Sequence, residues 1–169
     1  MTRLNLGCGF NHKDGFINCD NNPDTKPDLI LDLERLLPWE SGTVDYVLGQ
    51  EVFEHIRNFV PLMKEIHRIL KPGGILEAMV PSFPCRASIA DPDHVRFFVP
   101  ESFDMFCDPT NHPYFTGAGL FNVKNLKTRF TQFPDMTEQQ SKDFFTEVHV
   151  TMEKVEWFKA STGMWIIKR

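Results

Sequence analysis

Two glycines on either side of a cysteine, Gly7-Cys8-Gly9, directly follow the alternating stretch Leu4-Asn5-Leu6. The alternation predicts a short buried strand, and the glycines let the backbone turn tightly and approach a ligand without a Cβ in the way. Asp20 ends the next predicted strand, where its carboxylate can accept hydrogen bonds from both hydroxyls of a ribose. The pattern favours a cofactor that contains an adenosyl group; the simpler alternative is a glycine-rich turn beside a solvated Asp20. His12 stands where a dinucleotide fingerprint would have its third glycine, which counts against NAD and FAD.

A second set of residues that could do chemistry lies in the segment 82–120, which is dense in aromatic and polar residues. Such a composition suits a lid over an otherwise open site. We predict His94 as a general base whose ring is oriented by Asp91 or Asp93, and His112 as a weaker candidate for the same role.

Structural roles compete with this interpretation. His94 and Arg96 could instead pin the lid through hydrogen bonds to backbone carbonyls or to the aspartates, and His55 is expected to pack behind the fourth strand. A metal site made of Asp91, Asp93 and His94 has suitable ligand types. However, three ligands so close in sequence have no distant partner, so we expect no metal.

The elements that must position these residues alternate between strands and turns. Strands are predicted at 4–6, 16–20, 28–31, 44–48 and 75–80, with the Leu37-Pro38-Trp39 turn between the third and the fourth. Apolar residues recur at helical spacing after Asn58, a plausible N-cap, until Lys71-Pro72-Gly73-Gly74 ends the helix. This order predicts an α/β protein with a mostly parallel sheet.

The first two connections are too short for ordinary crossover helices. Residues 8–15 join the first two strands and 21–27 join the next pair, whereas a parallel crossover usually needs a dozen or more residues. We therefore predict reduced helices in the first half of the chain and one thinly covered face of the sheet. The C-terminal segment or a second subunit, in a possible homodimer, is expected to shield that face.

The rest of the chain is expected to complete the sheet. Residues 121–133 are predicted as a strand, 137–145 as a short helix opened by Asp135 or Thr137, and 148–158 with 164–168 as an antiparallel hairpin turned at 161–163. The prediction is a Rossmann-like sheet of about seven strands with the last pair antiparallel. Residues 1–169 would form a single domain: a cofactor-binding half (1–81), a lid (82–120) and the completing strands (121–169).

Composition excludes several classes of protein. The 18 Lys and Arg against 23 Asp and Glu give a net charge of −5, which does not favour binding to duplex nucleic acid by phosphate neutralisation. The basic stretch 124–129 more simply protects a solvated strand edge. No apolar run is long enough to cross a membrane, and no basic, apolar leader precedes the first strand. Four widely spaced cysteines without a Cys-x-x-Cys pair suggest a reduced, cytoplasmic protein without structural zinc.

The sequence resembles the class I S-adenosylmethionine-dependent methyltransferases, in particular the small type 11 group. The matching pieces, over about the first half of the chain, are the following, in the family's order: Leu4-Asn-Leu-Gly-Cys-Gly9, Asp20, Asp32-Leu33, Leu37-Pro-Trp39, Val44-Asp-Tyr-Val47, Glu51-Val-Phe-Glu-His-Ile56 and Leu70-Lys-Pro-Gly-Gly74.

The resemblance implies a set of cofactor contacts. Gly7, Cys8 and Gly9 would contact the methionine end of the cofactor, and Asp20 would hold the ribose. The remaining expected contacts are Asp32 and Leu33 at the adenine, Gln50 near the sulfonium, and Asn5 and Asn21 beside the glycine turn and Asp20. Many family members have an acidic residue in place of Asn5, so any contact of that charge to the ammonium or to the glycine turn would be weaker here. The Asn/Asp-Pro-Pro-Tyr signature of amino-group nucleic-acid methyltransferases is absent after the fourth strand.

A methyl group on a sulfonium is already activated, so the enzyme chiefly holds the acceptor in line with the carbon–sulfur bond and keeps water out. The expected function is methyl transfer to a small molecule or a sugar, at oxygen rather than nitrogen. The expectation of a sugar acceptor rests on analogy to relatives in glycan pathways. Two alternatives stay open. One is a cofactor-binding regulatory module without turnover, and the other is a nucleic-acid methyltransferase that works with a basic partner subunit.

Overall fold

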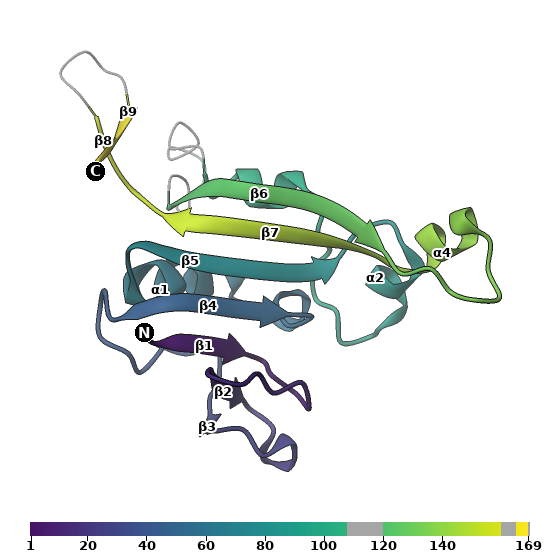
Figure 1. The fold of residues 1–169 in the computed structure, drawn as a ribbon, viewed down its shortest axis with the longest axis horizontal. Helices are drawn as coiled ribbons and strands as arrows, with labels where there is room; N and C mark the ends of the chain where they lie inside the picture. The colour runs from purple at the N-terminus through teal and green to yellow at the C-terminus, as the bar shows by residue number, and fades with distance from the viewer. Residues whose placement is uncertain (108–119, 160–164, 169) are drawn as a thin grey trace.

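The computed structural model describes residues 1–107, 120–159 and 165–168. Seven strands form one sheet: β1 (Arg3–Leu6), β2 (Ile17–Asp20), β3 (Leu29–Ile30), β4 (Val44–Gln50), β5 (Leu70–Pro81), β6 (Phe121–Phe130) and β7 (Thr146–Lys154). Their order in space is β3-β2-β1-β4-β5-β7-β6 (Figure 1). Strands β1 to β5 pair in parallel, and β7 runs antiparallel to both β5 and β6. The predicted fold class is confirmed.

The expected crossover helix is present as α1 (Phe59–Ile69). Its apolar stripe is buried against the sheet, as the spacing predicts. Asn58 holds the N-cap position, but its side chain makes no capping hydrogen bond. The carboxylate of Glu34 acts instead, accepting hydrogen bonds from the backbone N–H groups of Arg57 at 2.6 Å and Asn58 at 3.0 Å. An acid brought from a distant turn thus stabilises the positive end of the helix.

The predicted loss of the first crossover helices is also confirmed. Only turns connect β1 to β2, and a single 3-10 turn, η1 (Pro23–Thr25), precedes β3. A second 3-10 turn, η2 (Phe53–His55), follows β4, and two short helices, α2 (Arg86–Ala90) and α3 (Glu101–Asp104), lie in the predicted lid.

Strand β5 begins earlier than the sequence predicts. Lys71-Pro72-Gly73-Gly74 does not separate helix from strand, because Leu70 already pairs with Val44 and the next pair is Ile75 with Tyr46. The four residues form an irregularity within β5, and Gly73 has a φ of +74° that suits glycine.

The C-terminal part contains one confirmed element and one correction. Helix α4 (Glu138–Phe144) begins after Thr137, one of the two predicted N-caps, which forms a capping box with Gln140. The hairpin strands β8 (Glu156–Lys159) and β9 (Trp165–Lys168) pair antiparallel, but in a separate two-stranded sheet. The predicted arm 148–158 is divided: most of it lies in β7, which completes the main sheet together with β6 as expected, and its end forms β8. The expectation that 164–168 joins the main sheet is wrong. The predicted turn at 161–163 lies outside the described residues.

Alternation along the central strands separates two faces of the sheet. One face carries the apolar core, with residues such as Leu6, Val47, Leu76 and Met152 packed with α1. As drawn in Figure 1, α1 lies behind the sheet, and no helix among the described residues crosses the near face. Within the described parts of the chain, no helix is long and apolar enough to span a membrane.

Candidate functional site

A cavity of about 400 Å³ lies where β1, β2 and β4 end. This volume is in the range of small-molecule sites. It is lined by Gly7, Gly9, Asp20, Asn21, Leu31, Asp32, Leu33, Glu34, Glu51, Val52, His55 and Ile56. Six of the nine predicted cofactor residues are therefore brought together at the carboxyl edge of the parallel sheet, where ligands bind in open α/β folds.

The turn after β1 requires its glycines. Gly7 has a φ of +62° and Gly9 a φ of +49°, in the left-handed region. A Cβ on Gly7 would lie 2.2 Å from Cγ2 of Val52, so the backbone turn fits closely against the residue that follows β4. A Cβ on Gly9 would meet no atom within 4 Å, which leaves that side of the turn open to a ligand.

Asp20 is held in place by backbone donors at the end of β2. Its Oδ2 accepts a hydrogen bond from the N–H of Gly9 at 2.7 Å, and its Oδ1 accepts one from the N–H of Asn22 at 2.9 Å. Each carboxylate oxygen has a second lone pair. Asp20 therefore fixes the glycine turn and can still accept hydrogen bonds from a pair of hydroxyls.

The opposite wall of the cavity is apolar, with acids at its rim. Leu31, Leu33, Val52 and Ile56 are buried. Asp32 accepts hydrogen bonds from the N–H of Glu34 at 2.9 Å and from Nε of Arg35 at 3.0 Å, and these bonds lower the pKa of its carboxyl.

The chemistry of the lining fits the cofactor that the sequence implies. An apolar slot can take an adenine ring, and four acids (Asp20, Asp32, Glu34 and Glu51) surround the cavity. S-adenosylmethionine presents hydroxyl and amino donors together with a cationic sulfonium and ammonium, which such acids attract. The same acids would repel the pyrophosphate of a dinucleotide.

Three predicted cofactor residues do not line this cavity. The buried Asn5 donates from Nδ2 to the backbone oxygen of Asn11 at 3.0 Å and to Oδ1 of Asn18 at 2.9 Å, so it braces the loop after β1. The backbone N–H of Cys8 donates to Cys19 O, and burial raises the pKa of its thiol. Gln50 accepts a hydrogen bond from Asn11. Contacts of these three to the cofactor stay predictions.

The predicted base and its acid are neighbours in the lid. Nδ1 of His94 lies 3.0 Å from the carbonyl oxygen of Ser88, and its Nε2 lies 3.8 Å from Oδ2 of Asp91. The His94 side chain is only 7% exposed, and it does not line the cavity. Asp93 accepts at its backbone oxygen from His55. The base role stays a prediction, and His112 lies outside the described residues.

The pinning alternative describes the geometry of the lid well. Arg96 donates from Nε to Ile56 O at 3.0 Å and from Nη2 to Arg57 O at 2.8 Å. With the bond from His94 to Ser88, these contacts hold residues 88–96 against the segment after β4.

Two residues of the Glu51-Val-Phe-Glu-His-Ile56 run have positions that the sequence did not reveal. His55 lines the cavity, so the expectation that it packs behind the fourth strand is wrong. Its ring lies 4.8 Å from that of His94, centroid to centroid. Glu54 is 1% exposed, and burial raises the pKa of its carboxyl to about 7. Alternation beyond a strand end does not predict such positions, because a 3-10 turn breaks the period of two.

Comparisons with known proteins agree with this fold. Residues 4–78 match the family model described as a methyltransferase domain. A putative methyltransferase from Bacillus halodurans superposes with a TM-score of 0.67 at 13% identity, covering 90% of this chain and 92% of that one. A methyltransferase from Archaeoglobus fulgidus, described as S-adenosylmethionine-dependent, superposes with a TM-score of 0.62 at 16% identity. The match covers 90% of this chain and 86% of that one.

A third similar structure contains a partner. It is a complex between the Haloferax volcanii Trm112 methyltransferase activator and a putative methyltransferase, with a TM-score of 0.64, 18% identity and coverage of 90% of this chain and 81% of that one. No match was found among curated protein sequences.

Proposed function

We propose that this chain is a class I S-adenosylmethionine-dependent methyltransferase and that it methylates a small-molecule or sugar acceptor, at oxygen. The cofactor supplies an activated methyl group. The observation that carries the proposal is the acidic cavity at the edge of the sheet, with Asp20 held between Gly9 and Asn22.

The residues around the cavity suit the binding of the different parts of S-adenosylmethionine. Asp20 would bind the ribose, Asp32 and Leu33 the adenine, and the turn at Gly7 and Gly9 the methionine end. The apolar wall would shield the adenine ring from water.

The lid offers a surface for the acceptor. Phe83 and Phe97 are 45% and 53% exposed, and their rings lie 5.7 Å apart. Exposed aromatic faces can pack against the apolar face of a sugar or of a ring-bearing small molecule. Contact with these rings would hold an acceptor without a charged partner.

Calorimetric titration of S-adenosylmethionine into the wild type, Asp20→Ala and Asp14→Ala tests the cofactor part. Asp14 is an exposed acid in the β1–β2 connection and serves as the matched control. We expect binding to the wild type and to Asp14→Ala, and a loss of at least about tenfold in Asp20→Ala, because two charge-assisted contacts and the brace on Gly9 disappear. Equal binding by all three proteins would remove Asp20 from the site.

The acceptor part is tested by release of S-adenosylhomocysteine with panels of hydroxylated and amine acceptors. Turnover with sugars or small hydroxyl compounds supports the proposal, and turnover with amines alone contradicts methylation at oxygen. No turnover with any acceptor, despite tight cofactor binding, would favour the regulatory module.

The four cysteines, all without a disulfide, support a place in the reducing cytoplasm.

A second candidate function has a specific observation in its favour. The similar Haloferax volcanii methyltransferase is held in a complex with an activator. By analogy, this chain would work with a partner subunit. A nucleic-acid substrate would require that partner to be basic, because this chain has a net charge of −5. Salt-dependent retention of RNA or DNA, by the chain alone or after a partner is added, would favour this second function over the first.

A further inference from the structure

Glu54 is a buried carboxyl without a hydrogen-bond partner. The residue is 1% exposed, and neither Oε1 nor Oε2 has a partner among the described residues. Buried polar groups in folded proteins are nearly always satisfied, because an unpaired one costs free energy. The carboxylate of Glu54, in the η2 turn after β4, therefore needs a bound proton or a nearby cation to compensate its buried charge.

Two histidines lie close to this carboxyl, and Nδ1 of each is bonded to a backbone carbonyl. Nδ1 of His94 lies 3.0 Å from Ser88 O, and Nδ1 of His55 lies 3.3 Å from Asp93 O. A carbonyl oxygen only accepts, so each Nδ1 carries the proton, and Nε2 of the neutral ring keeps its lone pair. Metal-binding histidines are commonly oriented in this way, with the other ring N–H donated to a backbone carbonyl.

The distances bring the three side chains within reach of one ion. Nε2 of His94 lies 4.0 Å from Oε1 of Glu54, and one ligand atom from each of Glu54, His55 and His94 lies within 4.8 Å of the others. Tetrahedral bonds of about 2.0–2.1 Å place ligand atoms about 3.3 Å apart. Small side-chain rotations close this difference, and Oδ2 of Asp91, 3.8 Å from Nε2 of His94, is a nearby fourth donor.

We propose that Glu54, His55 and His94 bind a divalent transition-metal ion of the zinc class, with Asp91 at the fourth position. Two imidazoles and carboxylate oxygens are a ligand set typical of zinc. The metal site considered from the sequence lacked a partner distant from Asp91 and His94. The fold supplies that partner by placing the turn after β4 against the lid.

The ion would join two parts of the chain at the wall of the cofactor cavity. Glu54 and His55 belong to η2, whereas Asp91 and His94 belong to the lid, and His55 also lines the cavity. Binding would therefore fix the lid beside the cofactor. An ion on Nε2 of His94 would occupy the lone pair that the predicted base role needs, so the two roles exclude each other. The site itself does not depend on the proposed function.

The test is metal binding by the full chain, freed of any affinity tag and stripped with a chelator. Zn²⁺ is titrated by calorimetry, and Co²⁺ by its visible absorption, which reports coordination geometry. The variants are Glu54→Gln and His94→Gln. The control is His149→Gln, because His149 also pairs with a carboxylate, that of Glu147 at 2.8 Å, but on β7.

We expect one ion per wild-type chain, four-coordinate cobalt, and a rise in Tm with Zn²⁺. Each cluster variant should weaken binding by at least about tenfold, and the control should leave it unchanged. Metal-free Glu54→Gln should be at least as stable as the metal-free wild type, because an amide replaces an unpaired buried carboxyl.

Three results would overturn the proposal. They are no binding of either ion to the wild type, binding that both cluster variants retain, and a cobalt–thiolate charge-transfer band, which would assign the ion to the cysteines. If one cluster variant does not fold, the other variant and the cobalt spectrum of the wild type still decide the matter. None of these measurements involves S-adenosylmethionine, so failure of the proposed function would not affect them.

Discussion

At the scale of single residues, the lip of the cavity contains backbone strain. Glu51 has a φ of +49°, unusual for a residue with a Cβ, and its N–H donates to Met79 O at 2.9 Å. The left-handed conformation costs a non-glycine residue about 1–2 kcal/mol. Strain of this kind concentrates at functional sites, and here it turns the chain from β4 into the η2 turn that carries Glu54 and His55.

Replacing Glu51 measures this strain. Glu51→Gly should be more stable than Glu51→Ala by about 1 kcal/mol, because both changes remove the carboxylate and only glycine relieves the left-handed conformation. Urea unfolding of the two variants gives the difference. Equal stability, or a more stable alanine variant, would show that the backbone at position 51 is not strained in solution.

Residue types predicted the cofactor side of the site better than the lid. Gly7, Gly9 and Asp20 follow from local rules, because a left-handed turn needs glycine and the carboxyl end of a parallel strand is where an acid meets a ligand. Of the neighbours of His94, the sequence predicted Asp91 but not Glu54. Glu54 lies near His94 only because η2 packs against the lid, and this packing leaves no periodic signal in the sequence.

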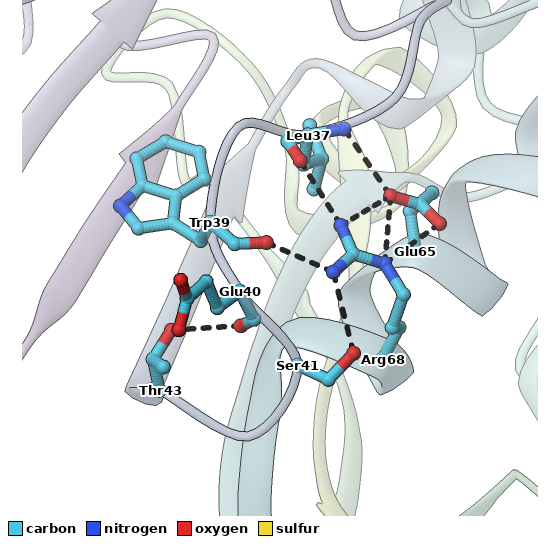
Figure 2. Close-up of polar contacts among 7 residues, drawn as sticks. All are labelled: Leu37, Trp39, Glu40, Ser41, Thr43, Glu65 and Arg68. Carbon is cyan, nitrogen blue, oxygen red and sulfur yellow. Dashed lines mark hydrogen bonds and ion pairs between the residues drawn. The ribbon is translucent and has the colours of Figure 1, made fainter.

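At the scale of elements, one arginine joins helix α1 to the turn before β4. Figure 2 shows the guanidinium of Arg68 between Glu65 and the turn. It donates to Leu37 O at 3.0 Å and Trp39 O at 2.8 Å, and its Nη2 lies 2.7 Å from Oε2 of Glu65. The predicted Leu-Pro-Trp turn is thus fixed by a side chain about thirty residues further along.

Arg68→Met should destabilise the protein by about 2–3 kcal/mol, because two backbone carbonyls and Glu65 lose a charged donor. The matched control is Lys142→Met, which removes the exposed helical pair with Glu138 and should change stability by less than about 0.5 kcal/mol. Chemical unfolding of both variants measures the contrast. Similar losses in the two would mean that the turn contributes nothing beyond a surface ion pair.

A histidine on the same helix gives a dependence on pH. Nε2 of His67 donates to Val155 O at 3.0 Å, and burial lowers the pKa of the ring below 6.5. Below pH 6.5 the unfolded chain therefore binds more protons than the folded one, and this contribution to stability falls as the pH falls.

Between pH 7 and pH 5, His67→Gln should lose less stability than the wild type, since glutamine can keep the hydrogen bond and does not titrate. Unfolding free energies at several pH values test this expectation. Parallel curves for the two proteins would show that His67 titrates alike in the folded and unfolded states.

Elements were predictable where the period was regular. Helix α1 and the alternating strands were correctly placed, since each buries one face. Residues 164–168 were placed in the wrong sheet, because their pairing with the end of the predicted arm 148–158 satisfies the same alternation in either sheet. Local pattern identifies strand partners across a turn, but not which larger sheet they join.

At the scale of the whole molecule, no helix among the described residues covers the sheet face opposite α1, because the short connections cannot form one. Its side chains are half-buried and partly polar: the Tyr46 hydroxyl donates to the Glu77 carboxylate, and the Arg3 guanidinium lies 5.2 Å from the Tyr46 ring. Parallel sheets are usually covered on both faces. Among the described residues, strands β6 and β7 extend the sheet at its edge and do not cover this face. We propose that the second subunit, one of the two covers expected from the sequence, shields it.

We therefore expect a dimer of the 19.6 kDa chain, formed through this face. Thr151 lies on it, opposite Glu77, so Thr151→Arg should abolish the dimer while the new guanidinium pairs with that acid and the monomer stays folded. Thr128→Arg, on an exposed part of β6, is the control that should remain dimeric. Light scattering coupled to size exclusion gives the mass of each protein. A monomeric wild type would mean that the polar pairs on this face make it stable in water, and that the chain replaces a helical layer with side-chain hydrogen bonds.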